Sequence, residues 1–139
     1  MHREPQLSPT HEMYLKVLFR LGEQRDVARV RDMAKGLGVS PGTVSAVLKK
    51  LDRLGLVKHN RYEAVTLTPA GTEVAQSVVR RFETIRAMLI EVLGLDLDDA
   101  EDDACMMEHT VSPVTVDRME RLLRLVRNGE IDLTPMRAG

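Results

Sequence analysis

The 139-residue sequence has only one cysteine and no apolar run long enough to span a bilayer. One thiol cannot form an intramolecular disulfide, so a reducing cellular interior is expected. The polar N-terminal segment, with a proline at position 5, lacks the features of a signal peptide. The chain also lacks a glycine-rich phosphate loop and a recognisable nucleophile–base pair, which argues against an enzyme. These absences favour a soluble, cytoplasmic, non-catalytic protein that does not bind membranes.

Charge is unevenly distributed along the chain. Residues 1–81 carry 14 Lys and Arg against 8 Asp and Glu, whereas residues 82–139 carry 6 against 13. A basic half joined to an acidic half indicates that the first half binds a polyanion and that the second has another role.

Four of the Ser/Thr-Pro pairs in the chain mark expected helix starts, because the hydroxyl caps the helix and proline suits its first position. Apolar residues at helical spacing follow each pair. Two further helices are expected at residues 30–37 and about 98–108. The helix that starts after position 68 is expected to end at Gly94. The pairs are Ser8-Pro9, Ser40-Pro41, Thr68-Pro69 and Ser112-Pro113.

Between Gly55 and Thr68 the apolar pattern becomes typical of strands, with a turn expected at Asn60-Arg61. The predicted fold class is therefore mainly α with a small β-hairpin. A winged helix-turn-helix is expected over residues 1–71 and a helical domain over residues 72–129. Residues 130–139 are expected to form a loose tail.

Apolar spacing from Met33 to Leu48 is that of a helix-turn-helix, with Gly38 at the turn and the corner sealed by Val39, Val44 and Leu48. The second helix then presents small residues first and cations farther along, and the hairpin adds basic residues that could reach phosphates. The alternative is a helical hairpin with a solvated charged face. The predicted DNA-contacting residues are Thr10, Arg31, Ser40, Gly42, Thr43, Ser45, Ala46, Lys49, Lys50, Lys58 and Arg61.

The most specific chemistry lies between Asp103 and His109. Cys105, Glu108 and His109 stand at i, i+3 and i+4, so they are expected to project from one helical face. Thiolate, carboxylate and imidazole at this spacing could hold a divalent first-row metal with help from other ligands. The alternatives are a core cysteine and a solvated Glu-His pair.

With these motifs the chain resembles the diphtheria-toxin-repressor family of metal-dependent regulators, from about Ser8 to Leu125. The Glu-Met-Tyr-Leu and Ala-Cys-x-x-Glu-His pairings are similar to those of its iron branch. The segments that carry the resemblance are 10–15, 40–45, 67–71, 94–96 and 103–109.

The resemblance implies a metal site formed by Met13, Cys105, Glu108 and His109, with the Cys105 carbonyl as a further donor. Sulfur ligands suit Fe(II), with Mn(II), Co(II), Ni(II) or Zn(II) as alternatives. The manganese branch would have carboxylates at positions 13 and 16, where this chain has methionine and Lys16. Packing alone could also explain Met13.

The chain departs from the family at three points. A second metal site would use the positions of Phe82, Arg86 and Glu101, but a phenyl ring cannot coordinate and a guanidinium repels a cation. Ala46 stands where the family has a side chain that reads bases, so a different operator is expected. The SH3-like domain of longer members is not expected here.

The expected function is a metal-dependent, homodimeric repressor that binds double-stranded operator DNA at metal-homeostasis genes. Pairing of two copies is expected through apolar residues in segments 85–93, 104–107 and 116–126. One alternative is a winged-helix regulator that responds to an organic ligand or to oxidation of Cys105. The other is a helical protein-interaction module that does not bind DNA.

Overall fold

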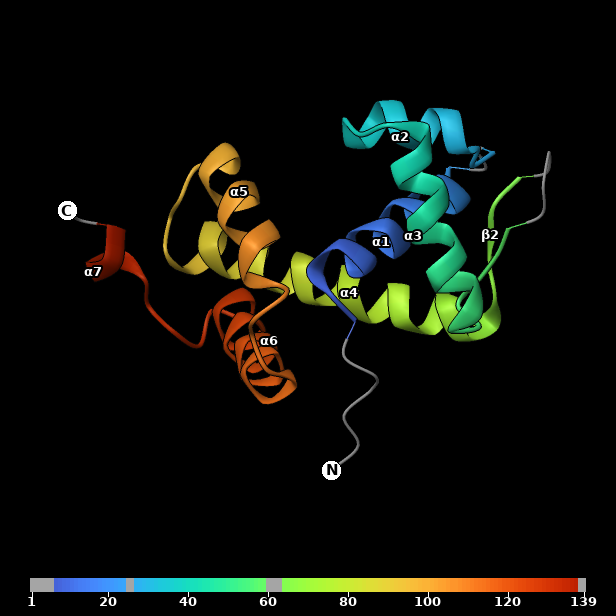
Figure 1. Ribbon diagram of the computed structural model, residues 1–139. Helices are drawn as coiled ribbons and strands as arrows, with labels where there is room; N and C mark the ends of the chain where they lie inside the picture. The colour runs from blue at the N-terminus through green and yellow to red at the C-terminus, as the bar shows by residue number, and fades with distance from the viewer. Residues whose placement is uncertain (1–6, 25–26, 60–63, 138–139) are drawn as a thin grey trace. The chain divides into compact units, whose positions relative to one another are not determined.

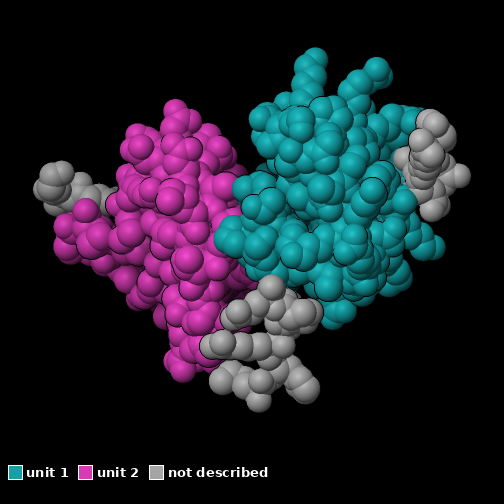
Figure 2. Space-filling view, in the orientation of Figure 1, with its two compact units in different colours: residues 1–77 teal, residues 78–139 magenta. Residues whose placement is uncertain are grey.

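The computed structural model describes residues 7–24, 27–59 and 64–137, and it is mainly helical with one small antiparallel hairpin, as predicted (Figure 1). Two compact units divide the chain, residues 1–77 and residues 78–139 (Figure 2). The elements are α1 (Pro9–Glu23), α2 (Val30–Leu37), α3 (Pro41–Arg53), β1 (Val57–Lys58), β2 (Thr66–Leu67), α4 (Pro69–Ala87), the π-helical turn η1 (Met88–Val92), α5 (Leu97–Met107), α6 (Pro113–Arg127) and α7 (Thr134–Arg137).

Helices α1, α3, α4 and α6 each begin at the proline of a Ser/Thr-Pro pair, which confirms those predicted starts. Each preceding hydroxyl accepts a hydrogen bond from a backbone N–H that has no partner within the helix. At α1 the cap is reciprocal, because the Ser8 N–H also donates to Nδ1 of His11 over 3.4 Å. The capping pairs are Ser8–His11, Ser40–Thr43, Thr68–Gly71 and Ser112–Thr115.

The first unit contains the predicted helix-turn-helix, formed by α2 and α3. Helix α2 ends at Gly38, whose φ of 68° lies in the left-handed region that glycine adopts without strain. Val39 was expected to seal the corner, but its side chain is 38% exposed, so that detail was wrong. Val44 and Leu48 are buried there as predicted, and the other buried side chains at the corner are Met33 and Ala34.

The wing is a hairpin of two-residue strands in which Val57 lies opposite Leu67. The Val65 N–H donates to the Ala28 carbonyl over 2.8 Å, which ties the wing to the segment before α2. The predicted turn at Asn60-Arg61 lies outside the described residues.

The start of α4 fits closely against the start of the wing. The Thr68 hydroxyl donates to the Gly55 carbonyl over 2.6 Å, and the Thr68 N–H donates to the Leu56 carbonyl over 3.1 Å. A Cβ atom at Gly71 would clash with that same Leu56 carbonyl. Only glycine therefore allows the first turn of α4 to lie this close to the wing.

The second unit has its own buried cluster, which α5 completes against the end of α4 and η1. The long helix changes to π-helical geometry at Met88, which apolar periodicity did not predict, and the segment ends at Gly94, with φ 74°, as predicted. Residues 134–137 form the short helix α7 within the segment expected to be a loose tail. The buried cluster consists of Phe82, Ile85, Leu89, Ala100 and Ala104.

Among the described helices, none is both long enough and apolar enough to cross a membrane.

Candidate metal centre and nucleic-acid interface

The predicted metal ligands of the second unit lie at the C-terminal end of α5. Cys105 is in its last turn, Glu108 is its C-cap residue, and His109 lies in the turn that follows. The three side chains were expected on one face of one helix. Because α5 ends at Met107, the position of His109 is set by the turn rather than by the helix.

Glu108 is completely buried and contacts the imidazole of His109. The distance from His109 Nε2 to Glu108 Oε1 is 3.3 Å, and only 9% of the His109 side chain is exposed. The solvated Glu-His interpretation is therefore wrong. A buried carboxylate needs a cation or hydrogen-bond donors to offset its lost hydration. This pair thus offers one oxygen and one nitrogen ligand in a desolvated place.

Cys105 is half-buried and packs against the apolar cluster of the second unit. Across the described residues, no three His, Cys, Asp or Glu side chains form a group that could hold a metal. The structure therefore brings Glu108 and His109 together, while Cys105 has a packing role one turn earlier on α5.

Met13 lies on α1 in the first compact unit, whereas the other three predicted ligands belong to the second. Its side chain is half-buried. Lys16, one turn later, is only 5% exposed, so the buried face of α1 includes a basic residue.

Arg86 contacts both Phe82 and Glu101, which explains why this position does not suit a second metal. The Arg86 guanidinium carbon lies 5.3 Å from the centre of the Phe82 ring, and Nη1 lies 3.3 Å from a Glu101 carboxylate oxygen. Glu101, the only carboxylate among these three residues, is thus already paired with the Arg86 guanidinium, which also lies over the Phe82 ring. The contact also holds α4 and α5 together.

Helix α3 presents the predicted DNA-contacting face to solvent. Opposite its buried face, small residues come first and cations follow in the last two turns. Ser45 is half-buried at the edge of this face, and the Ser40 oxygen is engaged as the helix cap, 2.9 Å from the Thr43 hydroxyl. The exposed residues of the face are Gly42, Thr43, Ala46, Lys49, Lys50 and Arg53.

The other predicted DNA contacts are also exposed where they are described. Thr10, Arg31 and Lys58 are exposed, whereas Arg61 lies outside the described residues. Burial lowers the pKa of His11, and the positive charge of Lys50 lowers it further. The charge of Lys50, near the end of α3, therefore acts on His11 at the start of α1.

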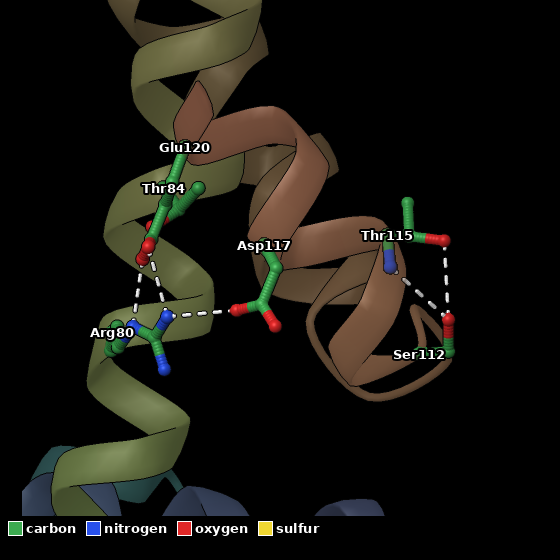
Figure 3. A network of polar contacts seen from close by, with 6 residues as sticks. All are labelled: Arg80, Thr84, Ser112, Thr115, Asp117 and Glu120. Carbon is green, nitrogen blue, oxygen red and sulfur yellow. Dashed lines mark hydrogen bonds and ion pairs between the residues drawn. The ribbon is translucent and has the colours of Figure 1, made fainter. Parts of the chain in front are cut away.

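A polar network joins α4 to α6 within the second unit (Figure 3). The Arg80 guanidinium donates to both carboxylate oxygens of Glu120, over 2.7 and 2.8 Å, and to Asp117 over 3.0 Å. The hydrogen bonds from Arg80 lower the pKa of Glu120 below its ordinary 4.5. Sequence analysis did not find this network, because its members are 37 and 40 residues apart and no local pattern links them.

A second arginine of α4 contacts the ligand-bearing turn itself. Arg81 Nε donates over 3.0 Å to the backbone carbonyl of Glu108. Sequence analysis missed this residue as well, and nothing in its local sequence distinguishes it from Arg80.

Two family descriptions match consecutive parts of the chain. "Iron dependent repressor, N-terminal DNA binding domain" matches residues 6–65, and "Iron dependent repressor, metal binding and dimerisation domain" matches residues 68–128. The chain belongs to the diphtheria-toxin-repressor family. It is a metal-dependent, DNA-binding transcriptional repressor and not an enzyme, which excludes the alternative of an interaction module that does not bind DNA.

Individual relatives agree with this assignment. An uncharacterised HTH-type transcriptional regulator of Methanocaldococcus jannaschii is 34% identical over 115 residues, which cover 82% of this chain and 92% of the relative. The diphtheria toxin repressor of Corynebacterium glutamicum is 33% identical over 117 residues, which cover 84% of this chain and 50% of that repressor.

A solved manganese-dependent transcriptional repressor in complex with manganese has the same fold. Its TM-score is 0.75 at 35% identity, and the match covers 81% of this chain and 52% of that one. This chain thus spans about half the length of that structure and of the diphtheria toxin repressor. The family match establishes dependence on a divalent metal without specifying which one.

Proposed function

We propose that this family member is a cytoplasmic, homodimeric repressor of metal-homeostasis genes that responds to Fe(II). Met13, Cys105, Glu108 and His109 would hold the ion. The observation that carries the proposal is the fully buried Glu108 carboxylate, 3.3 Å from the His109 imidazole at the end of α5. A desolvated carboxylate–imidazole pair is a suitable part of a site for a divalent transition metal.

The choice of Fe(II) over Mn(II) rests on the remaining donors. Thioether and thiolate sulfur favour softer metals, whereas carboxylates favour Mn(II). The buried Lys16 adds positive charge on the helix that carries Met13, and this disfavours a site with two manganese ions. Solved relatives with bound manganese make Mn(II) the main competitor.

Regulation would follow from where the ligands lie in the chain. Met13 belongs to the unit that contains the helix-turn-helix, and the other three ligands belong to the second unit. The bound ion would favour the arrangement in which the two heads of a dimer fit successive major grooves about 34 Å apart. A differential affinity of about 3 kcal/mol would shift the ratio of the two arrangements roughly a hundredfold.

Homodimerisation would use apolar side chains that the chain leaves exposed. Several side chains that were expected to lie between two copies are instead buried within this chain, because α5 packs against α4 and η1. They include Ile85, Leu89 and Ala104. Leu93, Met106 and Leu125, from the same three segments, are 46%, 76% and 41% exposed. We therefore propose that these side chains contribute to the interface between copies.

The decisive experiment is a metal titration read by affinity for the DNA upstream of the chain's own gene. Fe(II) is expected to raise that affinity more than Mn(II), Co(II) or Zn(II) does. Cys105→Ala and His109→Ala should abolish the metal response and leave the dimer folded. Asp102→Ala, which truncates an exposed side chain one turn before Cys105 on α5, is the matched control and should keep the metal response. A wild-type metal response in both ligand variants would refute the site.

A second candidate effector is an organic molecule bound in the first unit. A mostly apolar cavity of about 500 Å³ lies between α1, β2 and the segment before α2, and its size is typical of small-ligand sites. Phe19, Val27 and Val65 line it, with Glu23 among the lining residues. Operator affinity that is unchanged by a chelator, and lost in Phe19→Ala, would favour this candidate over the metal.

A further inference from the structure

The backbone that carries the candidate ligands needs support at the end of α5. The last carbonyls of a helix have no partner within it. The Met107 carbonyl accepts from the N–H groups of Thr110 and Val111, each over 3.0 Å. The next carbonyl, that of Glu108, accepts from Arg81 Nε over 3.0 Å, and this contact comes from α4. Arg81 is therefore a support for this turn from another helix.

The Glu108 carbonyl belongs to the peptide that joins the two candidate ligands. Fixing its direction restricts ψ of Glu108 and thus the direction in which His109 leaves the helix. Groups that orient metal ligands from outside the coordination sphere typically affect metal affinity by about 10- to 100-fold. A hydrogen bond to this one peptide thus acts on both an oxygen and a nitrogen ligand.

Three arginines of α4 contact different parts of the second unit. Arg80 binds carboxylates of α6 (Figure 3), and Arg86 binds Glu101 near the start of α5. Arg81 contacts the peptide between the candidate ligands, whereas Arg80 and Arg86 donate to carboxylates. The three residues have the same side chain on the same helix, so they form a natural set for comparison.

We propose that Arg81 is a positioning residue for the metal site, which holds Glu108 and His109 in the orientation that binds the ion. The inference rests on the proposed function, because it assumes that these two residues are ligands. The required feature for this role is an N–H donor at the position of Nε. Glutamine places its amide nitrogen at the same number of bonds from Cα, whereas methionine has similar length and no donor.

The test is Co(II) binding to the purified full-length chain, followed by the visible absorption of the bound ion and by equilibrium competition with a chelator. Arg81→Met should weaken Co(II) binding about 10- to 100-fold and change the absorption spectrum. Arg81→Gln should stay close to wild type in both. Arg80→Met and Arg86→Met, the matched controls, should bind Co(II) with wild-type spectra. Urea unfolding of the metal-free proteins reports any general loss of packing.

The outcomes separate this inference from the proposed function. If wild type shows no bound-Co(II) spectrum, both ideas fail. If wild type binds and Arg81→Met binds equally well, or if Arg81→Met and Arg86→Met lose affinity equally, the positioning role is refuted. Should Arg81→Met not fold, Arg81→Lys keeps the charge but moves the donor one bond farther along. A changed spectrum in that variant supports the proposal, and an unchanged one overturns it.

Discussion

At the scale of single residues, Gly71 shows how one missing side chain fixes a junction. The carbonyl of Leu56 occupies the space of its Cβ, and the Thr68 N–H donates to that same carbonyl. Gly36, inside α2, has no atom within 4 Å of the corresponding position. A side chain is therefore excluded at Gly71, whereas there is room for one at Gly36.

We predict that Gly71→Ala destabilises the protein by about 1–3 kcal/mol, because the added methyl forces the wing and α4 apart. The matched change Gly36→Ala should stabilise by about 0.5–1 kcal/mol, since alanine has the higher helix propensity and open space around it. Urea denaturation followed by circular dichroism measures both. Equal effects in the two variants would mean that the close approach to Leu56 does not constrain the fold.

Glu120 provides a pH-dependent contribution to stability. Its hydrogen bonds from Arg80 lower the pKa of the folded state below the ordinary 4.5. A lowered carboxyl pKa stabilises the fold fully above the unfolded value and loses that contribution as the pH falls through the folded value. Arg80 is 58% exposed, so solvent screening limits the contribution to about 1 kcal/mol or less.

Glu120→Gln should therefore lower the urea midpoint at pH 7, and its difference from wild type should shrink as the pH falls below 4.5 and the wild-type carboxylate takes up a proton. The measurement is denaturant unfolding of both proteins across this range. A difference between them that stays constant with pH would contradict the assignment of the contribution to the charged pair.

At the scale of elements, helix starts depend on hydroxyl caps of unequal importance. Ser112 accepts one backbone hydrogen bond at the start of α6, and its hydroxyl shares a second, over 3.1 Å, with the Thr115 hydroxyl of the same cap (Figure 3). Thr68 accepts the equivalent bond at α4 and also donates to the Gly55 carbonyl over 2.6 Å. The Thr68 hydroxyl therefore both begins a helix and joins that helix to the wing.

We expect Ser112→Ala to cost about 1 kcal/mol and Thr68→Ala to cost more, up to about 2 kcal/mol, because the second hydrogen bond of Thr68 joins α4 to the wing, whereas that of Ser112 stays within its own exposed cap. Thr68→Ser keeps the hydroxyl and should recover most of the loss. Thermal unfolding of the four proteins ranks them. If Thr68→Ala were no worse than Ser112→Ala, the bond to Gly55 would have no energetic importance.

Local signals explain which elements could be predicted from the sequence. Helix starts at Ser/Thr-Pro pairs and helix ends at Gly38 and Gly94 were predicted, because each depends on a few neighbouring residues. The π-helical turn at residues 88–92 packs against α5 and α6, and the apolar period of the sequence did not reveal it. The helix α7 was likewise not foreseen.

The candidate site was predicted by spacing, but its environment was not. The i, i+3, i+4 pattern identified Cys105, Glu108 and His109, whereas the complete burial of Glu108 and the end of α5 at Met107 depend on packing. Arg81 is 27 residues from Glu108 in the chain, and no local pattern connects them. Contacts of this kind become visible only in the folded structure.

At the scale of the whole molecule, charge separates the two halves of the chain. The first 81 residues are basic and the remainder is acidic. The cations on the outer face of α3 are exposed, as phosphate contacts require. Binding to DNA should therefore release counterions and depend steeply on salt.

We predict that operator affinity falls linearly with the logarithm of salt concentration, and that Lys49→Ala reduces the slope by about 1. Arg118→Ala, which removes an exposed cation from α6 in the second unit, should leave the slope unchanged. Fluorescence anisotropy across a series of KCl concentrations gives both values. A flat salt response in wild type would refute the predicted DNA-contacting face.

Among the described residues, the contiguous buried cluster of the second unit holds five side chains, whereas that of the first holds thirteen. Other buried side chains of the second unit, such as Val116 and Leu123, lie outside its cluster. A small core gives a folded region little stability of its own, and anything that binds only the native state adds to it. Metal and a second copy would both bind this part of the chain. In a metal-starved cell the regulator would thus be easier for proteases to degrade, so its lifetime, and not only its occupancy on DNA, would follow the metal supply.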